Sequence, residues 1–284
     1  MLPHTFIHLS GVGPVTERVL WDEGITTWEE FLSCTNLPSR VEVRRSELCP
    51  ILEGSRSRLV ASDASFFQAA LPAGERWRLY GDFRDRAAFL DIETTGLSPD
   101  SSHITMVGIY DVDGYSAFVK DENLEDLREA VEKYDLVVTY NGAAFDIPYI
   151  EHEFGRIFRQ TAHIDLRFPL SRLGYRGGLK SIERRLGLAR PSALSGLDGY
   201  DAVLLWRMWR QGDKGARDTL VSYNAEDVAS LPRLAEFAYD RLASGLGAPC
   251  TSLSPWQRPS LELPYDEDAV TRLRSMRTAR RPRW

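Results

Sequence analysis

The sequence Phe89-Leu90-Asp91-Ile92-Glu93-Thr94-Thr95-Gly96 places two acidic residues at the end of an apolar run. The apolar residues before them and the Thr-Thr-Gly turn after them predict a buried strand that runs out into a loop. Because strand side chains alternate, Asp91 and Glu93 point to the same face, with Cα atoms about 6–7 Å apart. Hard cations such as Mg²⁺ and Mn²⁺ take oxygen ligands. The stretch therefore fits either a metal site or a solvent-exposed strand end.

The residues after this strand predict an α/β fold. Two β-rich runs, 104–110 and 115–119, are joined by Asp113-Gly114, a strong hairpin signal, so three antiparallel strands are expected. A helix near 124–134 then leads to a short buried strand at 136–140, which is expected to lie parallel to the first strand in a mixed sheet flanked by helices. The rest of the chain is expected to be mainly helical, with candidate helices at 144–157, 178–187, 200–211 and 214–243.

A third acidic residue, Asp146, lies where the strand at 136–140 meets the following helix. The C-terminal ends of parallel strands share one edge of a sheet, which is the usual place for a ligand site. We therefore expect Asp146 to face Asp91 and Glu93. An acidic residue in the first turn of a helix is also favoured by the helix dipole, so a purely structural role stays open.

The last part of the pattern is Tyr223-Asn224-Ala225-Glu226-Asp227, inside the final long helical stretch. A spacing of four puts Tyr223 and Asp227 on one helix face, where alone they could simply cap a buried surface. The ordered set Asp-x-Glu, Asn-x-x-x-Phe-Asp and Tyr-x-x-x-Asp, however, resembles the motifs of the DnaQ-like, RNase H-fold 3′–5′ exonucleases, in their tyrosine-bearing DEDD subclass.

Further segments extend this resemblance over roughly 80–243. Residues 91–94 and 140–149 look like proofreading exonuclease segments of family B DNA polymerases. Residues 163–166 and 177–183 resemble segments of the stand-alone YprB-type exonucleases, which the absence of a polymerase-sized region favours.

The resemblance implies a two-metal hydrolysis of phosphodiester bonds with Mg²⁺ or Mn²⁺. By analogy Asp91 bridges both ions, Glu93 and Asp227 hold the ion that carries the attacking water, and Asp146 completes the site. Tyr223 would orient that water, because a phenol with a pKa near 10 is a better orienter than a base at neutral pH. The expected partner is nucleic acid, single-stranded or with a free 3′ end. We favour DNA, although the resemblance does not distinguish DNA from RNA.

Two alternatives remain: an RNase of the same fold, or a non-catalytic nucleic-acid-binding or assembly module. Several residues are candidates for substrate contact, each with a structural alternative. Phe145 could stack on a base or pack in the core, Lys180 could bind a phosphate or lie on a solvated helix face, and Asp165 could support the site or be structural. The candidates are Thr94, Asn141, Phe145, Asp165, Lys180, Gly11 and Gly13.

The N-terminal segment Leu9-Ser10-Gly11-Val12-Gly13-Pro14 predicts a tight turn followed by a helix, with Val15, Val19 and Leu20 as its apolar face. A second short helix should begin at Thr26 or Thr27, with Glu29 or Glu30 completing a capping box. The pattern resembles the helix-hairpin-helix motif, which holds a phosphate on backbone amides. It departs from that motif at Val15 and Glu17, so docking by a small helical module is the alternative.

We therefore divide the chain into a helix-hairpin-helix-like module (1–36), a connecting region (37–79), an RNase H-like exonuclease domain (80–243) and a Pro/Arg-rich tail (244–284). Within the connecting region and just beyond it, a helix is expected near 62–70 and a strand near 77–80. The tail contains six arginines between 272 and 283, a composition that is often disordered and solvated.

Composition limits the class of protein. A formal charge of −6 and a pI near 5.5 argue against a protein that coats nucleic acid by bulk electrostatics, but not against an enzyme that binds it locally. Cys34, Cys49 and Cys250 show no metal-binding spacing and form an odd set, so neither a disulfide framework nor a zinc site is expected. No apolar run approaches the roughly 20 residues of a membrane span, and no signal-peptide head is present, so we expect a cytoplasmic protein without a membrane partner.

Overall fold

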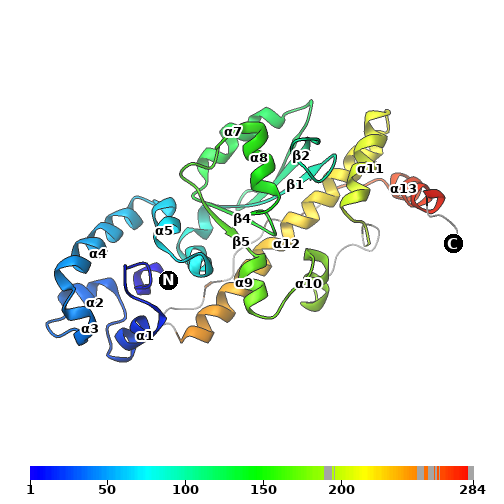
Figure 1. Cartoon of the computed structure of the whole chain (residues 1–284). Coiled ribbons are helices and arrows are strands. Elements are labelled where there is room, and N and C mark those ends of the chain that lie inside the picture. Colours follow the sequence, from blue (N-terminus) through cyan, green and yellow to red (C-terminus); the bar gives the residue numbers. More distant parts are fainter. Residues whose placement is uncertain are drawn as a thin grey trace.

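The computed structural model describes residues 1–188, 194, 196–247, 253–254, 259, 261 and 263–280, and these contain a five-stranded sheet of order β3-β2-β1-β4-β5 (Figure 1). The sheet is antiparallel from β3 through β2 to β1 and parallel from β1 through β4 to β5. The strands are β1 (Ala87–Thr94), β2 (Ile104–Asp111), β3 (Gly114–Val119), β4 (Leu136–Thr139) and β5 (Ala162–Asp165). The predicted mixed sheet is confirmed, whereas β5 was not predicted.

The two faces of the sheet are covered by different helices (Figure 1). Along β1, Ala88, Leu90 and Ile92 pack with α7 (Leu127–Ala130) and α8 (Asp146–Phe154). Ala87 and Phe89 pack instead with the long helix α12 (Lys214–Leu246). Because side chains alternate along a strand, Asp91 and Glu93 continue the face that α12 covers.

The remaining helices lie mostly at the two ends of the chain. The expected helices at 178–187, 200–211 and 214–243 are confirmed as α10, α11 and α12, and the expected one near 62–70 as α5. These and the remaining described α-helices have the bounds α1 (Pro14–Asp22), α2 (Trp28–Ser33), α3 (Ser39–Glu42), α4 (Arg45–Val60), α5 (Ala64–Ala70), α6 (Tyr80–Phe83), α9 (Arg167–Arg172), α10 (Leu179–Arg185), α11 (Gly199–Arg210) and α13 (Glu267–Arg280). The 3₁₀ helices are η1 (Leu2–His4), η2 (Ala73–Leu79), η3 (Arg84–Arg86), η4 (Leu124–Asp126) and η5 (Val131–Lys133).

The N-terminal region begins as the sequence predicts. Gly13 is the N-cap of α1, and Pro14 occupies its first turn. Thr27 caps α2, and its side chain and that of Glu30 form the reciprocal bonds of a capping box. Such a box satisfies backbone donors that a helix start otherwise leaves unpaired.

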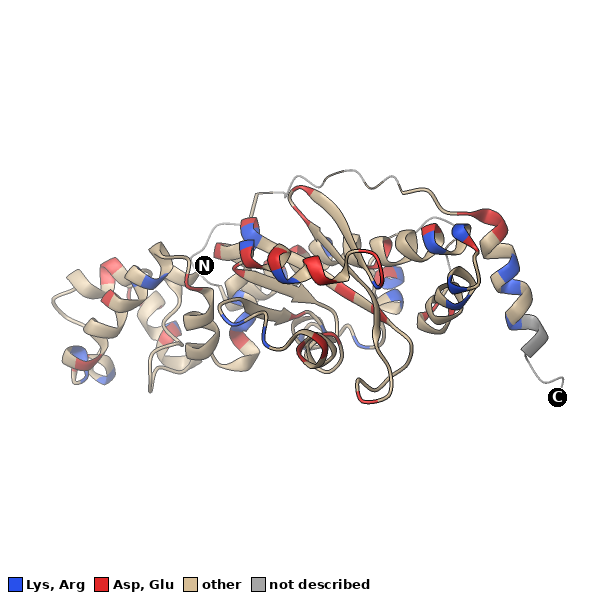
Figure 2. Cartoon of the chain, turned by 90° about the horizontal axis from the view of Figure 1, so that it is seen from above, with Lys and Arg blue, Asp and Glu red and all other residues tan. Residues whose placement is uncertain are grey.

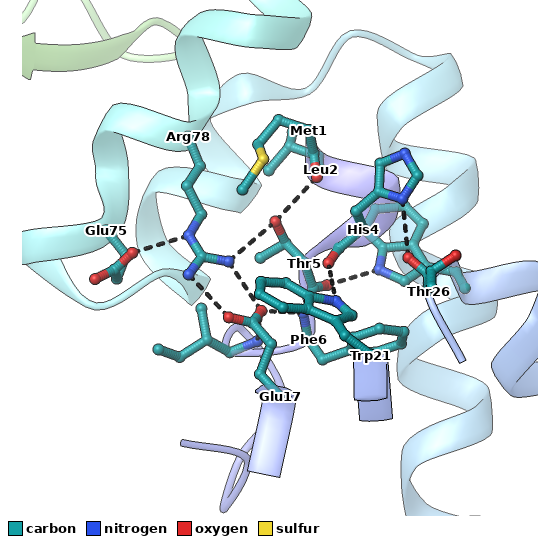
Figure 3. Close-up of polar contacts among 12 residues, drawn as sticks. Met1, Leu2, His4, Thr5, Phe6, Glu17, Trp21, Thr26, Glu75 and Arg78 are labelled. Carbon is teal, nitrogen blue, oxygen red and sulfur yellow. Dashed lines mark hydrogen bonds and ion pairs between the residues drawn. The ribbon is translucent and has the colours of Figure 1, made fainter. Parts of the chain in front are cut away.

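The predicted apolar face of α1 is wrong in part, because Val15 and Val19 are exposed and Glu17 is buried. The Glu17 carboxylate accepts hydrogen bonds from the amides of Phe6 and Ile7, at 2.7 and 3.1 Å. It also forms a two-point ion pair with the buried guanidinium of Arg78, at 2.8 and 2.9 Å (Figure 3). The pairing fixes which side of α1 faces inward, since a buried carboxylate needs these partners.

The strand predicted near 77–80 is wrong: these residues lie in η2 and at the start of α6. Trp77, Leu79 and Tyr80 are buried as expected of apolar residues, but Arg78 between them is buried as well, held by Glu17 and by Glu75 at 2.9 Å. Arg78 made the segment look like a strand with alternating buried and exposed residues, but its side chain is buried because it is paired with Glu17 and Glu75. Residues 37–79 are largely helical, and their buried side chains join a core that continues into the sheet.

The C-terminal tail contains a helix, α13, that packs on α11 and α12 through Ala269, Val270 and Leu273. Figure 2 shows acidic residues at its start and basic residues farther along it. Glu267 and Asp268 in the first turn favour the helix, because negative charges are stabilised near a helix N-terminus. The expectation of a solvated tail is therefore wrong for this segment, while Cys250, Arg281 and Arg283 lie outside the described residues.

Within the part of the chain that the structure describes, no helix is long and apolar enough to span a membrane.

Candidate metal centre

Three carboxylates converge between β1 and α12. Asp91, Glu93 and Asp227 each offer an oxygen atom, and these atoms all lie within 4.8 Å of one another. Glu93 and Asp227 are buried, whereas Asp91 is partly exposed, so the cluster opens to solvent on its Asp91 side. The register of the β1–β2 pairing shifts between Glu93 and Thr94, so the regular antiparallel pairing is interrupted beside the cluster.

The sequence of α12 brings Asp227 to this place. Tyr223 and Asn224 lie four and three residues before Asp227, spacings that bring each of them to the side of the helix where Asp227 lies. All three are buried.

Asn224 is a site residue that the sequence did not reveal. Its Nδ2 donates to Asp91 Oδ2 at 3.1 Å and to Glu93 Oε1 at 3.4 Å, and its Oδ1 accepts from the Tyr115 hydroxyl at 3.0 Å. Gly108, opposite Asp91 in the sheet, leaves the space that Asn224 fills, since a Cβ there would lie 1.7 Å from Asn224 Oδ1. The only signal was its spacing of three from Asp227.

Asp146 lies beside the cluster rather than in it. It is buried at the start of α8, and its Oδ1 accepts a hydrogen bond from the amide of Ile92 at 3.1 Å. Ile92 separates Asp91 from Glu93, so the bond holds the strand at the level of the acids. Asp146 is not among the carboxylates that lie within 4.8 Å of one another.

The pKa values of these acids reflect their crowding. Burial, followed by the Asp146, Glu93 and Asp227 charges, raises the pKa of Asp91 well above its usual value. Burial and the Asp227 charge raise the pKa of Glu93 to about 8, although the Asn224 amide and Lys180 oppose this. Burial also raises the pKa of Asp146 to about 7. The cluster therefore binds protons tightly without a counter-charge, and a cation would replace them.

Lys180 brings a positive charge to the rim of the cluster. Its Nζ donates to the Tyr223 hydroxyl at 2.5 Å and lies 4.1 Å from the centre of that ring. Nζ also donates to the carbonyl of Leu197, just before α11. Lys180 is thus neither a solvated helix residue nor distant from the acids, and it fixes the position of the Tyr223 hydroxyl.

The other candidates have mainly local bonds. Asp165 accepts from the backbone amides of Asn141, Ala143 and Arg167, which anchors the loop after β4. Asn141, in the left-handed conformation with φ 68°, accepts from Arg167 through its side chain. Thr94 donates to the carbonyl of Gly96.

Phe145 and Gly11 pack against residues other than the acids of the cluster. Phe145 is half-buried and packs against Tyr149 with ring centres 4.9 Å apart. Gly11 has φ 74° and lies under the Arg44 guanidinium, which donates to the Ser10 carbonyl at 2.6 Å. A side chain at Gly11 would clash with that guanidinium.

The donor set fits a hard divalent cation. All three converging ligands are carboxylates, which suit Mg²⁺ and Mn²⁺, and no sulfur or imidazole ligand joins them among the described residues. The raised pKa values of Asp91 and Glu93 give a physical reason for a cation: it would offset the repulsion among these crowded acids.

Comparison with known proteins gives a structural neighbour and a family. The family B DNA polymerase from the hyperthermophilic archaeon Pyrobaculum calidifontis is similar at 20% identity and a TM-score of 0.44, over 53% of this chain and 24% of that chain. No curated protein sequence gives a significant match. The model of the RNase H superfamily matches residues 88–239, from β1 into α12, which is more than half of the 284 residues. The chain therefore belongs to the RNase H superfamily.

Proposed function

We propose that this protein is a metal-dependent 3′–5′ exonuclease of the tyrosine-bearing DnaQ-like type, acting on nucleic acid with DNA preferred. The observation that carries the proposal is the convergence of Asp91, Glu93 and Asp227 within 4.8 Å in a member of the RNase H superfamily. The motif order around these residues supports the exonuclease class. In this proposal residues 80–243 form the catalytic domain, 1–36 a helix-hairpin-helix-like module, 37–79 a connection and 244–284 a tail.

Each residue has a stated role in the proposal. Asp91, the most accessible acid, would hold divalent cations together with Glu93 and Asp227. Asp146 supports the strand between Asp91 and Glu93. Divalent cations bound there would lower the pKa of an attacking water and offset charge on the leaving 3′ oxygen. Tyr223 orients that water through its hydroxyl, and Lys180 holds the hydroxyl in place.

The test is hydrolysis of 5′-end-labelled single-stranded DNA, duplex DNA and RNA by the purified protein with Mg²⁺ or Mn²⁺. We expect a ladder that shortens by single nucleotides from the 3′ end, fastest on single-stranded DNA, and none with Asp91→Asn. Faster degradation of RNA would favour an RNase of the same fold. Binding without degradation of any substrate would favour the non-catalytic alternative.

A further inference from the structure

A groove of about 630 Å³ lies between the end of β4, helix α9 and the turn that begins α10. Figure 1 shows α9 and α10 next to each other below the sheet. The lining combines two arginines, two tyrosines and small polar or backbone groups, and it includes no acidic residue among the described ones. A basic lining is notable in a protein of net charge −6. We call it the α9–α10 groove, defined by Tyr140, Asn141, Arg167, Tyr175, Arg176 and the Gly177–Gly178 turn.

The arginine at one side of the groove is held in place. Arg167 is exposed, and its Nη1 donates to the side-chain oxygen of Asn141 at 2.7 Å. Asn141 in turn donates its amide to Asp165 at 2.7 Å, and Asp165 also accepts from the Arg167 amide at 3.0 Å. The Arg167 guanidinium is therefore already held by the Asn141 side chain, so it loses less conformational entropy when it binds an anion.

The aromatic side of the groove is fixed as well. The Tyr140 hydroxyl donates to the carbonyl of Gly177. The Tyr175 ring packs edge-on against Phe237 at 5.3 Å, with the Arg185 guanidinium 4.7 Å from its centre. Gly177 has φ 117°, a backbone conformation that favours glycine. The turn therefore exposes backbone atoms to the groove at this position, with no side chain of Gly177 to cover them.

Both segments that border the groove are connected along the chain to residues beside the acidic cluster. The loop that contains Asn141 continues directly to Asp146 at the start of α8. Gly178 is the N-cap of α10, and Lys180 in the first turn of that helix contacts the Tyr223 hydroxyl. The two segments that border the groove therefore also carry Asp146 and Lys180, the neighbours of the acidic cluster.

We propose that the α9–α10 groove binds the sugar-phosphate backbone of a single nucleic-acid strand whose 3′ end lies at the acidic cluster. The inference rests on the proposed function and adds the path of the substrate. Paired arginines bind phosphate oxygens, and tyrosine rings offer stacking surfaces, a combination that binds single strands with little sequence preference. Arg167 and Arg176 contact phosphates, and Tyr175 contacts a base or sugar.

The first measurement is the affinity for a 5′-fluorescein-labelled dT₁₅ strand in EDTA over a range of KCl concentrations. The Arg167→Ala/Arg176→Ala variant should bind more weakly, and its slope of log K against log salt should fall by about 1.4, because two phosphates of a single strand no longer have an arginine partner. The control is Arg156→Ala/Arg159→Ala, which removes the same charge from the exposed loop before β5, on the side of the sheet where the parallel strands begin. The control should keep the wild-type slope, and equal slopes for the two variants would overturn the proposal.

The second measurement separates the groove from the catalytic centre. Thymidine 5′-(4-nitrophenyl phosphate) carries a single nucleotide and no further strand to lie in the groove, so the groove variant should hydrolyse it at the wild-type rate. The same variant should show a kcat/KM on dT₁₅ that is about tenfold lower than that of wild type, because the longer substrate depends on the groove for binding. Normal kcat/KM of this variant on dT₁₅ would refute the groove and leave the nuclease intact. A different result would be that the wild-type protein binds dT₁₅ in a way that the groove variant weakens, yet hydrolyses neither substrate. That result would refute the nuclease proposal and support the groove.

Discussion

At the scale of single residues, the centre of this protein is a group of acids whose repulsion is only partly offset. The Asn224 amide and the Lys180 ammonium both lower the pKa of Glu93, yet that pKa still rises to about 8. Asn224 is fully buried, and its side-chain oxygen accepts a hydrogen bond from the Tyr115 hydroxyl, which fixes the orientation of the amide. The neutral amide therefore maintains the spacing of Asp91 and Glu93 but does not replace a cation.

The roles of Asp91 and Tyr223 predict a ranking of two variants. Asp91→Asn removes a charge that the proposal assigns to cation binding, so it should lose nearly all turnover and weaken metal binding. Tyr223→Phe removes only an orienting hydroxyl and should lose about 10²–10³-fold in kcat, or roughly 3–4 kcal/mol, by analogy with removal of one oriented donor. Single-turnover hydrolysis and Mn²⁺ titration of both variants test this. Near-wild-type turnover by both would place the activity elsewhere in the chain.

At the scale of elements, the sequence predicted those that follow a strong period. Strands β1 to β4 and the helices α8, α10, α11 and α12 were located from alternation or helical spacing. Strand β5 was missed because it has only four residues. Helix α4 was missed because Pro50, Gly54 and several serines lower its intrinsic helix propensity, which packing of Leu48 and Leu52 overrides.

The contacts of Asn224 and Lys180 at the site were not predicted from the sequence, and both were missed for the same reason. Asn224 contacts residues more than 100 positions away, and Lys180 reaches Tyr223 across 43 positions. Neither contact has a local pattern in sequence. Asp91, Glu93, Asp146 and Asp227 were selected as candidates because strand alternation, strand-end position and helical spacing are local properties that a single sequence displays.

The ion pair between Glu17 and Arg78 predicts a large effect on stability at the N-terminal elements. Glu17→Ala would leave the buried Arg78 without its main counter-ion, which costs about 3–5 kcal/mol when one partner of a buried pair is removed. Urea denaturation measures the loss. The control Glu23→Ala changes an exposed residue at the end of α1 and should alter the free energy of unfolding by less than about 0.5 kcal/mol. Equal stability of the two variants would contradict the assigned role of Glu17.

Helix α13 predicts an effect on turnover at a distance. Arg277 pairs with Asp198 at 2.6 Å and with the fully buried Asp201 at 2.9 Å, next to Leu197, whose carbonyl holds Lys180. Arg277→Ala should loosen this connection and lower kcat on the order of tenfold, because small displacements of positioning groups reduce rates strongly. Arg272→Ala, which loses an exposed pair with Asp213, is the control and should keep the wild-type kcat. A kcat loss shared by both variants would mean that α13 acts only through stability.

At the scale of the whole molecule, the acids and the buried histidines act in different pH ranges. Burial lowers the pKa of His8 and of His163 to about 4, so their neutral forms favour folding and their effect is confined to pH below about 6.5. The Glu93 and Asp146 carboxyls, with pKa values of about 8 and about 7, act over a range that begins near their unfolded pKa of about 4 and extends above pH 6.5. Between pH 6.5 and 9 the acidic cluster therefore dominates the pH dependence of stability.

The sign of this dependence is a prediction. A carboxyl with a raised pKa in the folded state stabilises the fold most below its unfolded pKa of about 4, and this stability is lost as pH rises through the folded pKa. The metal-free protein should therefore lose stability from pH 6.5 to 9, and Mn²⁺ should restore it. Urea denaturation with EDTA or Mn²⁺ measures both effects, and Glu93→Gln should flatten the metal-free slope. A slope that rises over this range would contradict the raised pKa values.

The most direct test of the central claim is a calorimetric titration of Mn²⁺ into the metal-free protein at pH 7.5. The comparison is between wild type, Asp227→Asn and Asp218→Asn, where the last removes an exposed acid of the same helix outside the cluster. Wild type and Asp218→Asn should bind with equal affinity, whereas Asp227→Asn should bind at least about tenfold more weakly, since it removes one of the converging carboxylates. Equal Mn²⁺ affinity of Asp227→Asn and wild type would contradict the assignment of Asp91, Glu93 and Asp227 as a metal centre.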